Sequence, residues 1–429
     1  MNQVYSPVCD PIPHYRRSNR SPCTVGNIAI KLPKEPEPKP APLPQLALDM
    51  GIMSGKIVKI AITGGPCAGK TTLMAKAVQE LESRGVKVFI VPEAATTLIS
   101  GMHITPGDFG MIGFQSHILN NQFAMEHVVE TAAAELMEHG FQTVILCDRG
   151  KLDGLAYADA AAIEALLAEH GSNLVEARDS YDAVIHMVTA ANGAEEAYTL
   201  SNNAARSETP EQARELDTKT LKAWTGHPHL SIIGNTGTFQ EKIAVAIKVI
   251  YDCLGIPAPV ERERKFLALM PDLESLGKYN PVASQIVQTY LPDIGNTERR
   301  VRQRGDGTNF SFFYTEKTDL DGVTDRIERE SMITPRQYAS FLAQVDYGKI
   351  TPIHKTRHCF PYQDQYLELD VYAGEERYVT IEVEGLRKDS AVSFPPEITV
   401  VKEITGDKRF SNRAIAGNSG HLPEEALGG

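Results

Sequence analysis

The sequence has no excess of basic residues, few cysteines and no long apolar run. Its 429 residues carry a formal net charge of −12, whereas general nucleic-acid binders are usually basic, so we expect no nucleic-acid partner. The six cysteines are widely scattered, without the close pairs of a metal knuckle or a disulfide framework. No apolar stretch reaches the length of a transmembrane helix, and prolines stand where a signal peptide would be apolar. These absences predict a cytoplasmic protein without a transmembrane segment.

The length predicts two or three domains, and the patterns along the chain predict two folded domains between two irregular ends. Residues 1–54 contain a proline-rich stretch at 33–44, which can form neither a helix nor a central strand, so we expect a disordered leader. Strand and helix patterns alternate over 55–256 and predict the first domain. A period of two begins at 260 and continues to about 416, which predicts a second domain, and 417–429 is expected to be a flexible tail.

The first domain is organised around a glycine-rich loop between an apolar run and a helical segment. Glycines let backbone N–H groups point at an anion, and the following helix N-terminus adds partial positive charge. In such a P-loop, Lys70 reaches the terminal phosphates and the Thr71 hydroxyl holds magnesium. An ordinary glycine turn is the alternative, but the spacing and the strand–helix context favour nucleotide binding. The predicted loop comprises Gly64, Gly65, Pro66, Cys67, Ala68, Gly69, Lys70, Thr71 and Thr72.

Short runs rich in valine and isoleucine predict the strands of this domain. They lie at 57–63, 86–91, 143–148, 182–189 and 230–233, with amphipathic helical segments between them. This alternation predicts an α/β P-loop NTPase fold with a doubly wound, mostly parallel sheet. Ligands of such sheets bind beyond the carboxyl ends of the strands.

Three polar residues follow the predicted strands and are candidates for catalysis. Asp148 can hold magnesium or its water shell, and Glu93 can accept a proton from an attacking hydroxyl. Arg149 can brace a carboxylate or a phosphate through its planar fork. The alternative for Asp148 is a helix cap, and for Glu93 a position stabilised by a helix dipole.

A polar helical stretch between the last two predicted strands is a candidate lid. Arg206 and Arg214 lie two helical turns apart, on roughly one face. They can close over the phosphates and supply charge to the transferring group. The alternative is a solvated helix with ordinary surface charges.

Several motifs of the first domain resemble the AAA-type P-loop domain of nicotinamide-riboside-kinase-like proteins, and more closely the TRPL-translocation-defect protein family. The resemblance spans about 56–256 and extends to deoxynucleoside kinases, in which a glutamate is the base for the acceptor hydroxyl and a glutamine contacts the acceptor. Those roles would fall on Glu93 and Gln115. The acidic-Arg-Ser motif of that group is replaced here by Asp148-Arg149-Gly150. The other motifs are the glycine-rich loop, Val91-Pro92-Glu93, Phe114-Gln115, His186 to Glu196, and Trp224-Thr225-Gly226-His227-Pro228.

In the second domain, charged residues recur at every second position, so strand after strand presents one charged face. An antiparallel sheet with a wet outer surface is one interpretation. The other is a barrel with the charges inside, which would need a highly charged ligand because unpaired buried charge is costly. Arginine and lysine suit phosphate, and carboxylates suit magnesium or manganese. The alternating residues include Glu261, Glu263 and Lys265, then Arg300, Arg302 and Arg304, and later Lys355 and Arg357.

The opening Glu261-Arg262-Glu263-Arg264-Lys265 resembles the Glu-x-Glu-x-Lys signature of the CYTH, or triphosphate-tunnel, family, and later strands match it in order up to about 416. This resemblance implies an antiparallel β-barrel of about eight strands (α+β) whose lumen binds a triphosphate. It implies metal-side roles for Glu261, Glu263, Glu382 and Glu384. It implies phosphate-side roles for Lys265, Arg300, Arg302, Lys317, Lys355 and Arg357.

Together these patterns predict a nucleotide-binding P-loop NTPase fused to a metal-dependent domain that binds and hydrolyses a triphosphate. The expected cofactors are Mg²⁺ or Mn²⁺ with ATP or GTP, and the expected catalytic residues are Glu93, Asp148, Arg149, Glu261, Glu263 and Lys265. One alternative, implied by the TRPL-translocation-defect resemblance, is a non-enzymatic regulator of membrane-protein trafficking that binds GTP and phosphoinositide head groups at the membrane periphery. Another is a small-molecule kinase of nucleoside type.

Overall fold

The computed structural model describes residues 57–197, 209–256, 264–295, 297–319, 326–363, 365–384 and 391–423. The predicted leader at 1–54, Arg206, Glu261 and Glu263 lie outside these residues, and so does the side chain of Glu384.

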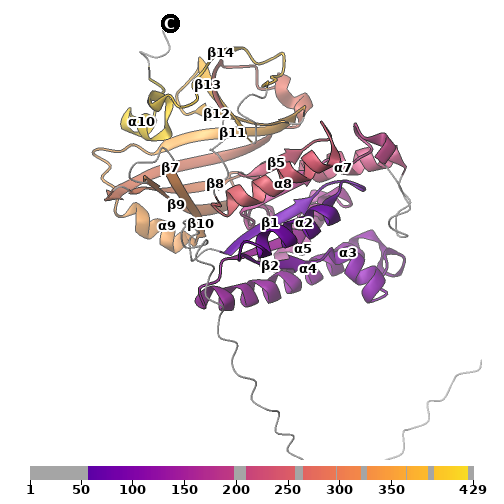
Figure 1. Ribbon diagram of the computed structural model, residues 1–429. Coiled ribbons are helices and arrows are strands. Elements are labelled where there is room, and N and C mark those ends of the chain that lie inside the picture. The colour runs from indigo at the N-terminus through magenta and orange to yellow at the C-terminus, as the bar shows by residue number, and fades with distance from the viewer. Residues whose placement is uncertain are drawn as a thin grey trace, which may run out of the picture. The chain divides into compact units, whose positions relative to one another are not determined.

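The first sheet is parallel, as predicted (Figure 1). Its strand order is β2-β3-β1-β4-β5, and every pairing in it is parallel. The fourth strand ends before the predicted 189, because the N–H of Thr189 bonds to a side chain, Asp217, rather than to a neighbouring strand. The strands are β1 (Ile57–Thr63), β2 (Lys87–Val91), β3 (Thr143–Asp148), β4 (Ala183–Met187) and β5 (Leu230–Ile233).

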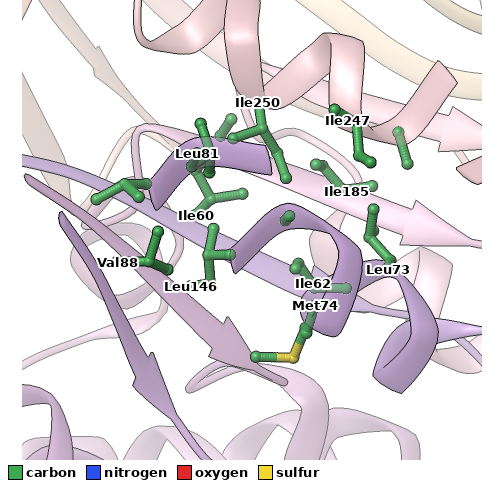
Figure 2. Close-up of a cluster of buried hydrophobic side chains, with 14 of the residues drawn as sticks. Ile60, Ile62, Leu73, Met74, Leu81, Val88, Leu146, Ile185, Ile247 and Ile250 are labelled. Carbon is green, nitrogen blue, oxygen red and sulfur yellow. The ribbon is translucent and has the colours of Figure 1, made fainter. Parts of the chain in front are cut away.

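Helices cover both faces of the parallel sheet, which is why its strands are apolar almost throughout. On one face, α2 and α8 pack on Ile60, Ile62 and Ile185, as Figure 2 shows. On the other face, Ala61 and Val184 pack in a second core with side chains of α4, α5 and α7. The helical elements are α2 (Lys70–Glu82), α3 (Ala94–Thr96), η1 (Thr97–Gly101), α4 (Pro106–Glu138), η2 (Asp153–Ala156), α5 (Ala160–Glu169), α6 (Leu174–Asp179), η3 (Glu195–Ala197), α7 (Pro210–Trp224) and α8 (Phe239–Cys253).

A separate antiparallel sheet follows, which confirms the predicted antiparallel pairing of the second domain but does not show the closure of a barrel. Over the described residues its pairings join the strands in a row, β10-β9-β8-β7-β11-β12-β13-β6-β14, rather than in a ring. The strands are β6 (Arg264–Leu269), β7 (Val282–Ile294), β8 (Thr297–Gly305), β9 (Phe310–Asp319), β10 (Arg326–Ile333), β11 (Ile353–Tyr362), β12 (Gln365–Tyr372), β13 (Tyr378–Glu384) and β14 (Val400–Glu403). Short helices accompany them: η4 (Ser275–Tyr279), α9 (Pro335–Leu342), η5 (Lys408–Phe410) and α10 (Asn412–Gly417).

The chain stays packed beyond the point where a flexible tail was expected to begin. Leu422 is buried, in one apolar cluster with Phe410 and Ile415, and its N–H bonds to Glu375. Burial of a leucine side chain is favourable by about 1.5–3 kcal/mol, which explains why residues up to this one are held in place.

Candidate functional site

The glycine-rich loop lies between β1 and α2, with its lysine at the first helical position. Gly64 has a φ of 130°, and a Cβ there would clash with the carbonyl oxygen of Met187. Lys70 is buried, and its Nζ donates to the carbonyl oxygens of Gly64 (3.1 Å) and Gly65 (3.0 Å). Burial, and then the charge of Arg149, lower the pKa of Lys70 to about 8. Lys70 therefore bonds to carbonyl groups of its own loop, and an anion bound there would stabilise its protonated form.

Glu93 and Arg149, predicted from separate strand ends, form an ion pair. Arg149 Nε lies 2.6 Å from Glu93 Oε1, and its Nη1 donates to Asp153 Oδ1 at 3.1 Å. Burial alone would raise the pKa of Glu93, but Arg149 and Thr96 outweigh it and hold that pKa at about 2. A carboxylate with so low a pKa is a weak base, so Glu93 can act as one only when Arg149 moves away from it.

Asp148 lies at the end of β3 with one carboxylate oxygen buried. Among the described residues, no donor reaches its Oδ1. Burial raises the pKa of Asp148, and the nearby charge of Lys70 opposes this rise. A buried oxygen without a donor is a group that a divalent cation or its water shell can take, so the side chain fits the predicted magnesium site.

Two acidic residues to which the sequence analysis gave no role support the P-loop. Asp217 on α7 accepts the N–H of Gly65 at 2.7 Å and that of Thr189 at 3.1 Å. Asp153 accepts from Arg149, from the Thr63 hydroxyl and from the N–H of Gly150. A signal for Asp153 existed, because an acid at the start of a helical turn can reach back to the N–H of the residue three positions earlier, as in a capping box.

Three other predicted residues of this domain take different positions. Gln115 is buried, and its Oε1 finds no donor among the described residues. Arg214, on the exposed side of α7, donates to the carbonyl oxygen of Ala191 at 2.7 Å. Thr71 lies at the exposed N-terminal turn of α2.

The antiparallel register gathers the predicted phosphate-side residues on one face of the second sheet, here called the charged face. Residues paired across antiparallel strands share a face. The pairs Arg300–Thr315, Arg357–Asp370 and Glu382–Lys265 illustrate the pattern. The basic residues of this face include Lys265, Arg300, Arg302, Arg304, Lys317, Lys355 and Arg357, and its described acidic residues include Glu330, Glu368, Asp370 and Glu382.

Arg357 lies at the centre of a buried ion-pair network on this face. It donates to Asp370 through Nε and Nη2, both at 2.7 Å, to Glu382 through Nη2 at 2.5 Å, and to Glu368 through Nη1. Lys355 Nζ lies 2.5 Å from Asp370 Oδ2, and burial, followed by the charge of Arg357, lowers the pKa of Lys355 to about 8. The network fixes these side chains in a low-dielectric site, where their charges act strongly on a ligand.

The other predicted residues surround this network. Lys265 Nζ lies 2.9 Å from Glu382 Oε1. Glu330 accepts from the Thr315 hydroxyl at 2.6 Å and lies 3.8 Å from Arg302 Nη1. Sequence reasoning assigned no role to Glu368, Asp370 or Glu330, although all three belong to the charged alternation.

The described part of the chain contains neither a cluster of metal-ligand side chains nor a helix that could span a membrane. No three histidine, cysteine or acidic side chains there are grouped as metal ligands, and Glu261 and Glu263 fall outside that part. In the same residues, no helix combines the length and apolar character needed to cross a bilayer.

The chain is similar to known proteins in a stretch that matches a family model and in a stretch that matches a curated relative. A family model described as an AAA domain matches residues 59–242. Two structures from Pyrococcus horikoshii OT3, the PH1819 and PH1012 proteins, share 19% and 15% identity. Each covers 30% of this chain, and 81% and 80% of its own, with TM-scores of 0.24 and 0.22, which are too low to support an argument.

An inorganic triphosphatase of Nitrosomonas europaea is 34% identical over 160 residues, which make up 36% of this chain and 96% of that protein. The AAA domain model thus matches the first part of the chain, and the chain belongs to the family of that inorganic triphosphatase.

Proposed function

We propose that this chain hydrolyses a phosphoanhydride bond of a triphosphate on its charged face and binds ATP or GTP at its P-loop. The observation that carries the proposal is the gathering of buried basic side chains on one face of the antiparallel sheet. The relationship to an inorganic triphosphatase supports tripolyphosphate as the first substrate to test. The two activities would belong to residues 260–416 and 55–256 respectively.

On the charged face, the basic residues bind and orient the phosphate oxygens. Arg300 and Arg302 come from β8 and Lys317 from β9, and most N–H groups of Arg357 bond to carboxylates. Lys355, with a pKa of about 8, is charged at neutral pH and can donate a proton from Nζ to the departing phosphate oxygen. Lys355 would therefore contribute more to catalysis than Arg357.

The residues of this face fit a divalent cation. Glu368 is buried, and no described donor reaches its Oε1; its neighbour across the strands is Glu382. Glu382 with Glu261, Glu263 and Glu384 would hold Mg²⁺ or Mn²⁺, which when bound neutralises phosphate charge and activates a water.

At the P-loop, Lys70 leaves the carbonyl oxygens of Gly64 and Gly65 and bonds to nucleotide phosphates. Thr71 and Asp148 would hold the cation of the bound nucleotide. Arg206 and Arg214 would supply positive charge from the lid.

The experiment is phosphate release by the full chain from tripolyphosphate, ATP and GTP, each with Mg²⁺ or Mn²⁺. Release from tripolyphosphate that is lost in Glu261→Gln/Glu263→Gln, with nucleotide binding retained, supports the proposal. Release that is unchanged in this double variant moves the chemistry to the P-loop.

A second candidate function, phosphoryl transfer to a small acceptor, is favoured by Gln115. Its buried Oε1 without a described donor is a group that a hydroxyl or amino group of an acceptor could satisfy. Transfer of labelled phosphate from ATP or GTP to a nucleoside panel, lost in Gln115→Leu, tests this candidate.

A further inference from the structure

The last residue of α7 and the turn that follows it form a short segment, residues 224–229, which lies against the charged face. This segment is called the turn below. Tyr366 on β12 accepts the N–H of Gly226 at 2.8 Å and donates from Oη to the carbonyl oxygen of His227 at 3.2 Å. Arg304 on β8 donates through Nη2 to the carbonyl oxygen of Gly226. One turn of the nucleotide-binding part is thus bonded to two strands of the second sheet.

Both anchoring residues lie on the charged face. Tyr366, Glu368 and Asp370 occupy every second position of β12, and Arg302 and Arg304 are two positions apart on β8. Side chains two apart in a strand share a face. The turn therefore covers one end of the face that also carries Lys355 and Arg357.

The contact is tightly packed. Gly226 has a φ of 99°, and a Cβ there would lie 2.8 Å from Val282 and 2.9 Å from Arg178 Nη1. Trp224, Tyr366 and Arg304 are buried. A displacement of the turn would therefore disturb the sheet, because close-packed interiors transmit strain.

Charge also links the two parts. Asp179 at the end of α6 pairs with Arg178, with Nε and Oδ1 2.6 Å apart. Burial opposes the ionisation of Asp179, but Arg178 and then Arg304 keep its pKa below the usual value. The charge of Arg304 is thus felt by an acid of the nucleotide-binding part.

The same helix contacts the P-loop. Asp217 on α7 accepts the N–H of Gly65, and Trp224 at the end of α7 donates from Nε1 to Asp153 Oδ2 at 3.2 Å. Asp153 in turn holds Arg149. Phosphates that draw Lys70 or Arg149 away from the loop would change the bonds that position α7 and its turn.

We infer that α7 and the turn 224–229 couple the two ligand sites, so that a triphosphate on the charged face changes nucleotide affinity at the P-loop. Tyr366 is the positioning residue of this coupling. The inference rests on the proposed function, since it requires both ligands to bind. Coupling between binding sites is reciprocal, so it can be measured from either side.

Trp224 is the single tryptophan of the sequence. It bonds to Asp153 and adjoins the turn that is bonded to Tyr366, so we expect its emission to respond to both ligands. The test titrates the full chain with a non-hydrolysable ATP or GTP analogue, with and without tripolyphosphate. Tripolyphosphate is expected to shift the emission of Trp224 and to change the Kd of the analogue by about fivefold or more. Tyr366→Phe should bring this ratio close to one while tripolyphosphate is still hydrolysed.

The matched control is Tyr362→Phe. Tyr362 lies on β11, and its ring packs edge-on against Tyr279, which also belongs to the second domain. This variant should keep the full effect. Arg304→Lys is the second test variant if Tyr366→Phe does not fold, and it should also reduce the ratio.

An effect on analogue affinity that survives Tyr366→Phe shows direct competition at the P-loop and overturns the inference. If tripolyphosphate is hydrolysed but does not change the Kd of the analogue, the coupling inference is overturned and the proposed function stands. A chain that neither binds nor hydrolyses tripolyphosphate contradicts the proposed function itself, and the inference with it.

Discussion

The two sheets place their charged side chains in opposite ways. In the parallel sheet, helices cover both faces, so the candidate chemical groups lie at strand ends, on one loop and on helices, and not on the faces of the sheet. In the antiparallel sheet the charges lie on the strands themselves and are buried against each other. A strand-end residue can be changed without opening a core, whereas a buried charge on a strand supports its neighbours. Function and stability are therefore separable in the first part and joined in the second.

The largest effect should come from breaking the network of the second part. Arg357→Ala leaves Glu368, Asp370 and Glu382 buried without their common partner, and we expect a loss of about 3–5 kcal/mol in the free energy of unfolding. Urea denaturation of the full chain measures it. The control is Arg409→Ala, which removes an exposed pair with Asp407 and should leave the free energy of unfolding nearly unchanged. A loss of similar size in both variants would contradict the account.

Removing the P-loop lysine should affect binding and spare stability. Lys70→Ala should weaken nucleotide affinity by about 10- to 100-fold, because a charge-assisted hydrogen bond to phosphate is lost. Isothermal titration calorimetry measures the loss, with Lys76→Ala, on the exposed side of α2, as the control. Equal affinities in the two variants would show that Lys70 does not meet the phosphates.

Asp217 should have a smaller effect than the lysine, because it acts through the loop. Asp217→Asn keeps an oxygen acceptor but loses the charge that the N–H groups of Gly65 and Thr189 meet. We expect about a fivefold loss of nucleotide affinity, equivalent to about 1 kcal/mol. A loss as large as that of Lys70→Ala would mean that Asp217 contacts the nucleotide or its cation.

The smallest effect is a proton taken up with the nucleotide. With a pKa of about 8, Lys70 is half neutral at pH 8 in the free chain, and bound phosphates would raise that pKa. Binding at pH 8 should therefore take up about half a proton, and the uptake should fall towards zero at pH 6.5. Calorimetry in two buffers of different ionisation enthalpy measures it. Proton release at pH 8 would contradict the lowered pKa.

Much of the fold could be predicted from local patterns, because apolar strands and a glycine-rich loop are recognised from residues that are close together in the sequence. β1, β3 and β5 have the predicted bounds. The supporting acids did not follow, because Asp217 lies 152 residues from the Gly65 that it holds, and no local signal links them. The alternation predicted that charges share a face, but only the pairing of β11 with β12 determines that Arg357 meets Asp370.

The most direct test of the central claim compares Lys70→Ala with Lys355→Gln in phosphate release from tripolyphosphate by the full chain, without nucleotide. The account predicts that Lys70→Ala keeps most of the release and that Lys355→Gln loses about 100-fold, within the usual range for a proton donor. Lys349→Gln, an exposed lysine, is the control for the second variant. Release lost in Lys70→Ala and retained in Lys355→Gln would place the hydrolysis at the P-loop and contradict the account.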